Sequence, residues 1–88
     1  MTDEKLLELG FVKDIDNEYC VYYSRIDPKY NFTQVLCIMH KNSGRHLLSS
    51  YDRNLFDEKK IGNSAVGLTY LETRLALKKM KEKGWKSK

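Results

Sequence analysis

The fold is decided by a stretch rich in tyrosine and β-branched residues in the middle of the chain. From residue 18 to residue 51 it reads EYCVYYSRIDPKYNFTQVLCIMHKNSGRHLLSSY. Its three apolar runs are separated by the turn-forming clusters DPKYN (27–31) and NSG (42–44), a pattern typical of strands joined by short turns. We therefore expect strands over 18–26, 32–40 and 45–51, paired antiparallel in sequence order.

The residues before this stretch predict a short helix and one more strand. Segment 2–9 has acidic side chains in its first turn and three leucines, and Gly10 follows it, where a left-handed residue often ends a helix. Thr2 can cap this helix. Apolar and polar residues alternate over 11–15, which predicts a strand that leads into the first turn of the sheet.

The residues after the stretch predict a loop and a final helix. Segment 52–64 is polar and charged, and we expect a long loop. Thr69 and Glu72 match a capping box, which marks the start of a helix that runs to about Lys83 and ends before Gly84. The predicted fold class is α+β, in the order α-β-β-β-β-α. It is a four-stranded antiparallel meander sheet with a short N-terminal helix and a C-terminal helix, both on one face.

Length and composition bound the class of protein. The 88 residues fit one domain, 1–88, whose lysine-rich C-terminal end, 78–88, accounts for the net charge of +4. Hydrophobic content of 41% and aromatic content of 11% indicate a globular chain. The acidic N-terminus lacks the layout of a signal peptide, and the longest apolar runs are far shorter than a membrane span. We therefore expect a cytoplasmic protein without membrane contact.

The turns also predict which side chains share a face of the sheet. If Ile26 pairs with Phe32 around the turn at 27–31, alternate residues of the strands sort into two faces. Cys20 and Cys37 then point to opposite faces, so we expect both thiols to be free. The predicted core face, covered by the helices, holds Phe11, Ile15, Cys20, Tyr22, Ile26, Phe32, Leu36, Ile38 and Leu48. The second face holds Val12, Tyr19, Val21, Tyr23, Val35, Cys37, Met39, Leu47 and Tyr51.

The second face is apolar, whereas the outer face of a one-sided antiparallel sheet is normally polar. An apolar surface rimmed by charge indicates an interface, and interfaces favour tyrosine and methionine. The alternative is that segment 52–64 folds over this face, anchored by Leu55, Phe56 and Ile61. The predicted partner is another protein or a second copy of the chain. The predicted contact residues are Tyr19, Val21, Tyr23, Val35, Met39, Leu47 and Tyr51.

The last helix suggests a second surface. At 100° per residue, one stripe of this helix collects Arg74, Lys78, Lys81 and Trp85. A basic stripe that ends in tryptophan can follow the phosphates of a nucleic acid while the ring stacks on a base. The alternative is a solvated, lysine-rich helix end whose Trp85 folds onto the core.

The sequence carries no motif that indicates catalysis or a cofactor. His40 and His46 face each other across a three-residue turn, but zinc needs at least one further protein ligand, so no metal site is predicted. Cys37 and His40 are three residues apart on one strand and point to opposite faces, so they cannot act as nucleophile and base. We therefore expect a protein that is not an enzyme and binds no cofactor.

Two resemblances bear on function. The order helix, strands, helix is similar to that of double-stranded-RNA-binding domains, but the basic cluster with which that family starts its last helix is missing from residues 65–69, AVGLT. The acidic first helix, the Leu9-Gly10-Phe11 junction and the lysine-rich last helix resemble small proteins of Gram-positive phages and prophages. That resemblance implies a modulator of a host or defence protein. We expect a binding protein that uses the second face, and nucleic-acid binding by the basic stripe is the alternative.

Overall fold

The computed structural model describes residues 1–57 and 64–85 and belongs to the predicted α+β class. Four strands form one antiparallel sheet in the order β1-β2-β3-β4, so strands adjacent in the sequence are adjacent in the sheet. The predicted meander with a short N-terminal helix and a C-terminal helix is confirmed. The elements are α1 (Thr2–Glu8), β1 (Val12–Asp16), β2 (Cys20–Asp27), the 3-10 turn η1 (Pro28–Tyr30), β3 (Phe32–Met39), β4 (Leu47–Asp52), α2 (Arg53–Asp57) and α3 (Tyr70–Glu82).

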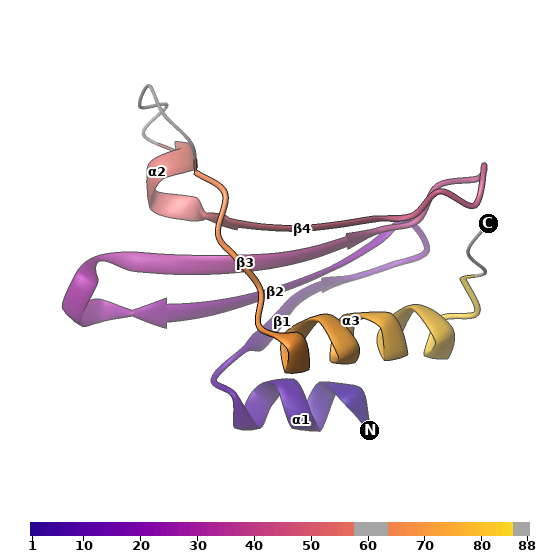
Figure 1. Ribbon diagram of the computed structural model, residues 1–88, viewed down its shortest axis with the longest axis horizontal. Coiled ribbons are helices and arrows are strands. Elements are labelled where there is room, and N and C mark those ends of the chain that lie inside the picture. The colour runs from indigo at the N-terminus through magenta and orange to yellow at the C-terminus, as the bar shows by residue number, and fades with distance from the viewer. Residues whose placement is uncertain (58–63, 86–88) are drawn as a thin grey trace.

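The helices divide between the two faces of the sheet. Figure 1 shows α1 and α3 side by side on one face and α2 on the other side, near the end of β4. Residues 64–66 then run along β4. The Asp52 N–H donates to the carbonyl of Ser64 at 2.8 Å, and the Val66 N–H donates to the carbonyl of Ser50 at 2.9 Å. These bonds pair the outer edge of β4 before the chain crosses to α3.

The β3–β4 register is as predicted, but the β2–β3 register is shifted by one residue. Asp27 pairs with Phe32, the position that the sequence suggested for Ile26. The turn is tighter than expected because Asp27 accepts the Lys29 N–H at 3.1 Å and Asn31 adopts the left-handed conformation, with φ of 49°. The shorter loop moves every β2 side chain to the face opposite the predicted one.

This shift changes the composition of the core. Val21 and Tyr23, predicted on the second face, are buried beneath the helices. A bulge in β1 after Lys13 also moves the Ile15 side chain to the face opposite the predicted one. The predicted core residues that lie instead on the opposite face are Ile15, Cys20, Tyr22 and Ile26. The core cluster consists of Leu6, Phe11, Val21, Tyr23, Leu36, Ile38, Leu75, Ala76, Met80 and Trp85, with Leu9, Leu48 and Leu68 against it.

Most local signals at the helix ends are confirmed. Gly10 ends α1 with φ of 95°, a conformation that glycine adopts readily. Thr69 and Glu72 form the predicted capping box at the start of α3. The sequence suggested that Thr2 caps α1, but this prediction is wrong. Thr2 lies within the helix, and its hydroxyl donates to the carboxylate of Glu82 in α3.

A network of charged groups holds both helices on the sheet. Asp3 of α1 accepts hydrogen bonds from the Tyr23 hydroxyl at 2.6 Å and from Lys13 at 2.9 Å, and it pairs with Lys79 of α3 at 3.1 Å. Burial by itself raises the pKa of the Asp3 carboxyl, but these three donors outweigh burial and hold that pKa well below its usual range. The remaining ion pairs of this charge network join Asp16 to Lys13, Lys79 and Lys83.

Arg25 of β2 connects three other parts of the fold. Its guanidinium donates to the Leu9 carbonyl at 3.0 Å and to the side-chain oxygen of Gln34 at 2.6 Å. It also pairs with Glu72 at 3.0 Å and lies 4.2 Å from the centroid of the Phe11 ring. Glu72 is 3% exposed, so Arg25 compensates a buried negative charge.

Loss of Arg25 should therefore destabilise the fold strongly. In Arg25→Met the Glu72 carboxylate stays buried without its cation, and we expect the free energy of unfolding to fall by about 3 kcal/mol. Urea unfolding followed by circular dichroism measures this loss. Arg53→Met is the control, because Arg53 pairs with Asp14 near the surface at 3.4 Å and should contribute less than about 1 kcal/mol. Equal losses in the two variants would contradict the role given to Arg25.

The charge network predicts that stability declines in acid and in strong alkali. The pKa values of Asp3 and Asp16 are lowered in the folded state, that of Asp16 chiefly by its hydrogen bond from Lys83. Their contribution is therefore complete above the ordinary carboxyl pKa of about 4 and is lost as the pH falls through the folded values. Burial and the bond to Asp3 raise the pKa of Tyr23, so its contribution is complete below about pH 10 and is lost as the pH rises further.

Urea midpoints measured across the pH range should show both declines. Asp3→Asn should lower the stability at neutral pH by about 1 to 2 kcal/mol, since it weakens hydrogen bonds to a charged, partly exposed group. It should also flatten the acid decline, because the titrating group with the lowered pKa is gone. An acid decline as steep as in the wild type would show that Asp3 is not its source.

Candidate functional site

The sheet face opposite α1 and α3 is covered at one end. This end holds Val35 and Thr33, which are 0% and 7% exposed, and α2 lies against β3 there. Arg53, the first residue of α2, reaches Asp14 of β1. Figure 1 shows α2 near one end of the strands and on the side away from α1 and α3. The opposite end of the face has no such cover among the described residues.

The covering element is the start of the segment predicted as a long loop. It forms α2, which Asp52 caps by accepting the Asn54 N–H at 3.0 Å. Leu55 is 40% exposed, and the other two predicted anchors, the Phe56 side chain and Ile61, lie outside what the structure describes. Because α2 has five residues, its cover extends over part of the face.

The uncovered end of this face carries apolar side chains that we call the open patch. Ile15 and Leu47 are 43% and 50% exposed, whereas Cys37, opposite Tyr22 in the sheet, is 3% exposed. A hydrogen bond with the Cys37 thiol, together with burial, raises the pKa of Tyr22 to about 12. The open patch consists of Ile15, Cys20, Tyr22, Cys37, Met39 and Leu47, and it contains no acidic or basic side chain.

The structure brings together only some of the predicted interface residues. Met39 and Leu47 pair with each other in the open patch. Tyr51 pairs with Val35, so it lies between the open patch and the end covered by α2, and Val35 is buried. Tyr19 lies in the turn between β1 and β2 and is 66% exposed.

The prediction that Val21 and Tyr23 lie on the second face is wrong, because both belong to the core. Sequence reasoning also missed Ile15, Cys20 and Tyr22, which it had assigned to the core face. Their placement depends on the bulge in β1 and on the length of the turn between β2 and β3. The aspartate that begins this turn and the asparagine that ends it are the sequence signals that could have indicated the shorter loop.

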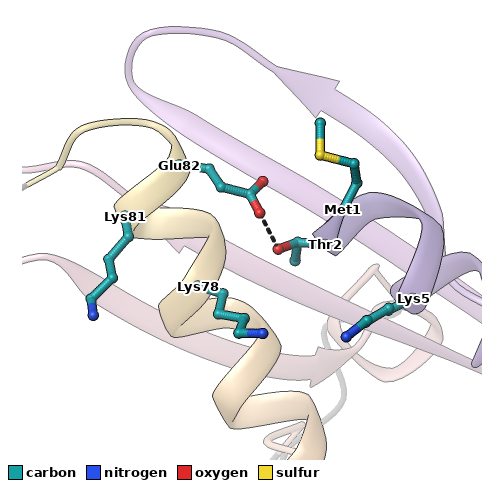
Figure 2. A pocket seen from close by; sticks show the side chains of 6 residues that line it. All are labelled: Met1, Thr2, Lys5, Lys78, Lys81 and Glu82. Carbon is teal, nitrogen blue, oxygen red and sulfur yellow. Dashed lines mark hydrogen bonds between the residues drawn. The ribbon is translucent and has the colours of Figure 1, made fainter.

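The basic residues predicted on the last helix form part of a second surface. Arg74, Lys78 and Lys81 are exposed on α3, and Lys5 of α1 lies across from them. Figure 2 shows the ammonium groups of Lys5 and Lys78 pointing toward one another across the space between the helices. We call this surface the basic groove, with Lys5, Arg74, Lys78 and Lys81 as its cations. The carboxylate of Glu82 lies at one end of it.

Trp85 does not belong to the basic groove. It is 9% exposed, and its ring stacks on His40 with the centroids 5.1 Å apart. The chain turns at Gly84, with φ of 77°, and the Trp85 N–H donates to the carbonyl of Met80. The prediction that this ring is available to a base is therefore wrong, and the alternative, in which it folds onto the core, is correct.

The two histidines face each other across the β3–β4 turn, as predicted. The Nδ1 atoms of His40 and His46 are 3.3 Å apart, and their rings stack. The Lys41 N–H also donates to Nδ1 of His46, at 3.1 Å, so this nitrogen is already an acceptor. Among the described residues, no group of three or more histidine, cysteine or acidic side chains is placed to hold a metal ion.

Comparisons with known proteins give this chain no family. No family model, no curated protein and no solved structure was found to match it. Within 1–57 and 64–85, the helices are too short or too polar to cross a membrane. Function must therefore be inferred from the two surfaces themselves.

The two thiols should differ in reactivity. Both cysteines are free and lie on the same face, since Cys20 pairs with Met39 and Cys37 with Tyr22, which corrects the prediction of opposite faces. Cys20 is partly exposed and Cys37 is buried. In dilute solution, where contacts between copies do not form, we expect Ellman's reagent to modify Cys20 in the folded protein roughly tenfold faster than Cys37 or more. Cys20→Ser should remove the fast phase and Cys37→Ser should retain it, and the reverse result would contradict the β2 register.

Proposed function

We propose that this is a non-enzymatic binding protein that acts through a protein–protein contact at the open patch, and that a second copy of the chain is its partner. The observation that carries the proposal is an uncharged and largely apolar surface, with Ser49 as its polar member, at the end of the sheet that α2 leaves open. Exposed apolar surface of this kind, beside charged side chains, marks interaction sites on soluble domains.

The residue types of the open patch support a protein partner. Tyr22 and Met39 are of the kinds that protein interfaces favour, and the half-exposed Ile15 and Leu47 supply aliphatic area that gains from burial. Fully burying one such side chain contributes on the order of 1.5 to 3 kcal/mol. A few of them at the centre of a contact are enough to carry most of its affinity.

The neutrality of the open patch supports a second copy as the partner. Two copies that meet through this patch bury no unpaired charge, which would otherwise oppose association. Two antiparallel sheets also pack well face to face, at about 10 Å. Pairing through the edge strand β1 is disfavoured, because Lys13, Asp14 and Asp16 lie along it together with the bulge.

Two adjacent leucines of β4 provide the test. Leu47 is half exposed in the open patch, whereas Leu48 packs against the core on the other face. We expect sedimentation equilibrium to show a wild-type dimer and a folded, monomeric Leu47→Asp variant. A buried unpaired charge should weaken the dimer by about a hundredfold or more. Leu48→Asp should instead damage folding, and circular dichroism with thermal melting separates the two effects.

Three outcomes would count against the proposal. The first is a wild-type protein that stays monomeric at concentrations of several hundred micromolar. The second is a Leu47→Asp variant that dimerises as tightly as the wild type. The third is a Leu47→Asp variant that unfolds like Leu48→Asp, since this would place Leu47 inside the fold.

A further inference from the structure

The described lysines of α1, β1 and α3, together with Lys83 at the end of α3, fall into two groups that differ in their partners. Lys13, Lys79 and Lys83 all pair with Asp3 or Asp16 in the charge network. By contrast, the cations of the basic groove form no ion pair with any described carboxylate. Lys5 and Lys78 even point toward one another (Figure 2). Like charges that no ion pair neutralises repel each other, so this groove is suited to an anion.

The basic groove is hollowed in two places that share Lys5 and Lys78. One hollow, of about 270 Å³, extends to Lys81 and Glu82. The other, of about 110 Å³, extends to Arg74 and is also lined by two leucines. Glu82 lines only the first hollow, and its carboxylate accepts the Thr2 hydroxyl. The second hollow has three cations and no carboxylate in its lining, so it offers the stronger attraction for a phosphate.

An exposed aromatic ring continues the groove beyond Arg74. Tyr70, Arg74, Lys78 and Lys81 follow one another at helical spacing on one side of α3. Tyr70 is 78% exposed, and the Arg74 guanidinium lies 5.7 Å from the centroid of its ring. A basic groove flanked by an aromatic ring on which a base can stack is the arrangement that binds single-stranded nucleic acids.

We propose that the basic groove binds the phosphate backbone of a single-stranded nucleic acid, with Tyr70 stacked on a base. Along the helix, Tyr70 and Lys81 are about 16 Å apart, which spans roughly five phosphates at the axial spacing of about 3.4 Å that a strand has in a stacked, B-form conformation, and fewer in an extended strand. Lys5 reaches the same strand from α1. This site lies on the helical layer, so it is independent of the open patch on the far face of the sheet.

Fluorescence anisotropy with labelled oligo(dT) and oligo(U) tests the proposal on the full chain. Affinity should fall steeply with salt, because each phosphate neutralised on a single strand contributes about 0.7 to the slope of log affinity against log salt. Four cations therefore predict a slope of about −3. Tyr70→Ala should weaken binding roughly tenfold through loss of stacking, without changing this slope.

The control is matched in charge. Lys5→Gln should reduce the slope by about 0.7, whereas Lys41→Gln, in the exposed β3–β4 turn, should leave it unchanged. Both lysines are exposed, so thermal melting should be the same for the two variants. The proposal is overturned by the absence of salt-sensitive binding, by equal effects of the two variants, or by tighter binding to duplex DNA than to single strands. None of these outcomes depends on the oligomeric state.

Discussion

Much of the fold depends on one carboxylate. Asp3 lies in the first turn of α1 and accepts donors from both neighbouring strands, Lys13 of β1 and Tyr23 of β2, as well as Lys79 of α3. It therefore fixes the positions of both helices on the sheet. The Tyr23 ring is buried in the core while its hydroxyl reaches Asp3, so the same side chain joins the apolar core to the charge network. An apolar residue at either position could fill space but could not set the orientation of α1.

The charge network also explains why the positive charge that remains is concentrated on the outer surface. In the run from Lys78 to Lys83, helical spacing directs Lys79 and Lys83 toward Asp3 and Asp16. The same spacing directs Lys78 and Lys81 outward, where they lie across from Lys5 of α1. No described carboxylate forms an ion pair with Lys78 or Lys81. Because Asp3 and Asp16 pair with the lysines that hold the helices on the sheet, the outward lysines keep their positive charge, and the basic groove results.

Features that depend on a few neighbouring residues with clear signals were predicted from the sequence, whereas the faces of β2 and the position of Trp85 were not. The capping box of α3, the left-handed Gly10 and the β3–β4 register each depend on a few neighbouring residues, and all were predicted. The faces of β2 depend on whether its turn holds four residues or five. The run CVYY at 20–23 is apolar on both sides, so its pattern does not reveal the answer. Trp85 was misplaced because a helical projection no longer applies after Gly84.

The open patch results from the path of the described chain after β4. A five-residue α2 is about 7.5 Å long, whereas the eight residues of β3 extend over about 27 Å, so α2 can cover only one end of the face. Residues 64–66 then run along the edge of β4 and satisfy backbone groups there, which a segment lying across the face could not do. The sheet thus has one edge closed by backbone pairing and the other, β1, protected by charge. Apolar area is left on a face instead of hydrogen-bonding groups at an edge. A face of this kind can contact a partner through its side chains, and the two protected edges disfavour open-ended strand addition, as the proposed dimer requires.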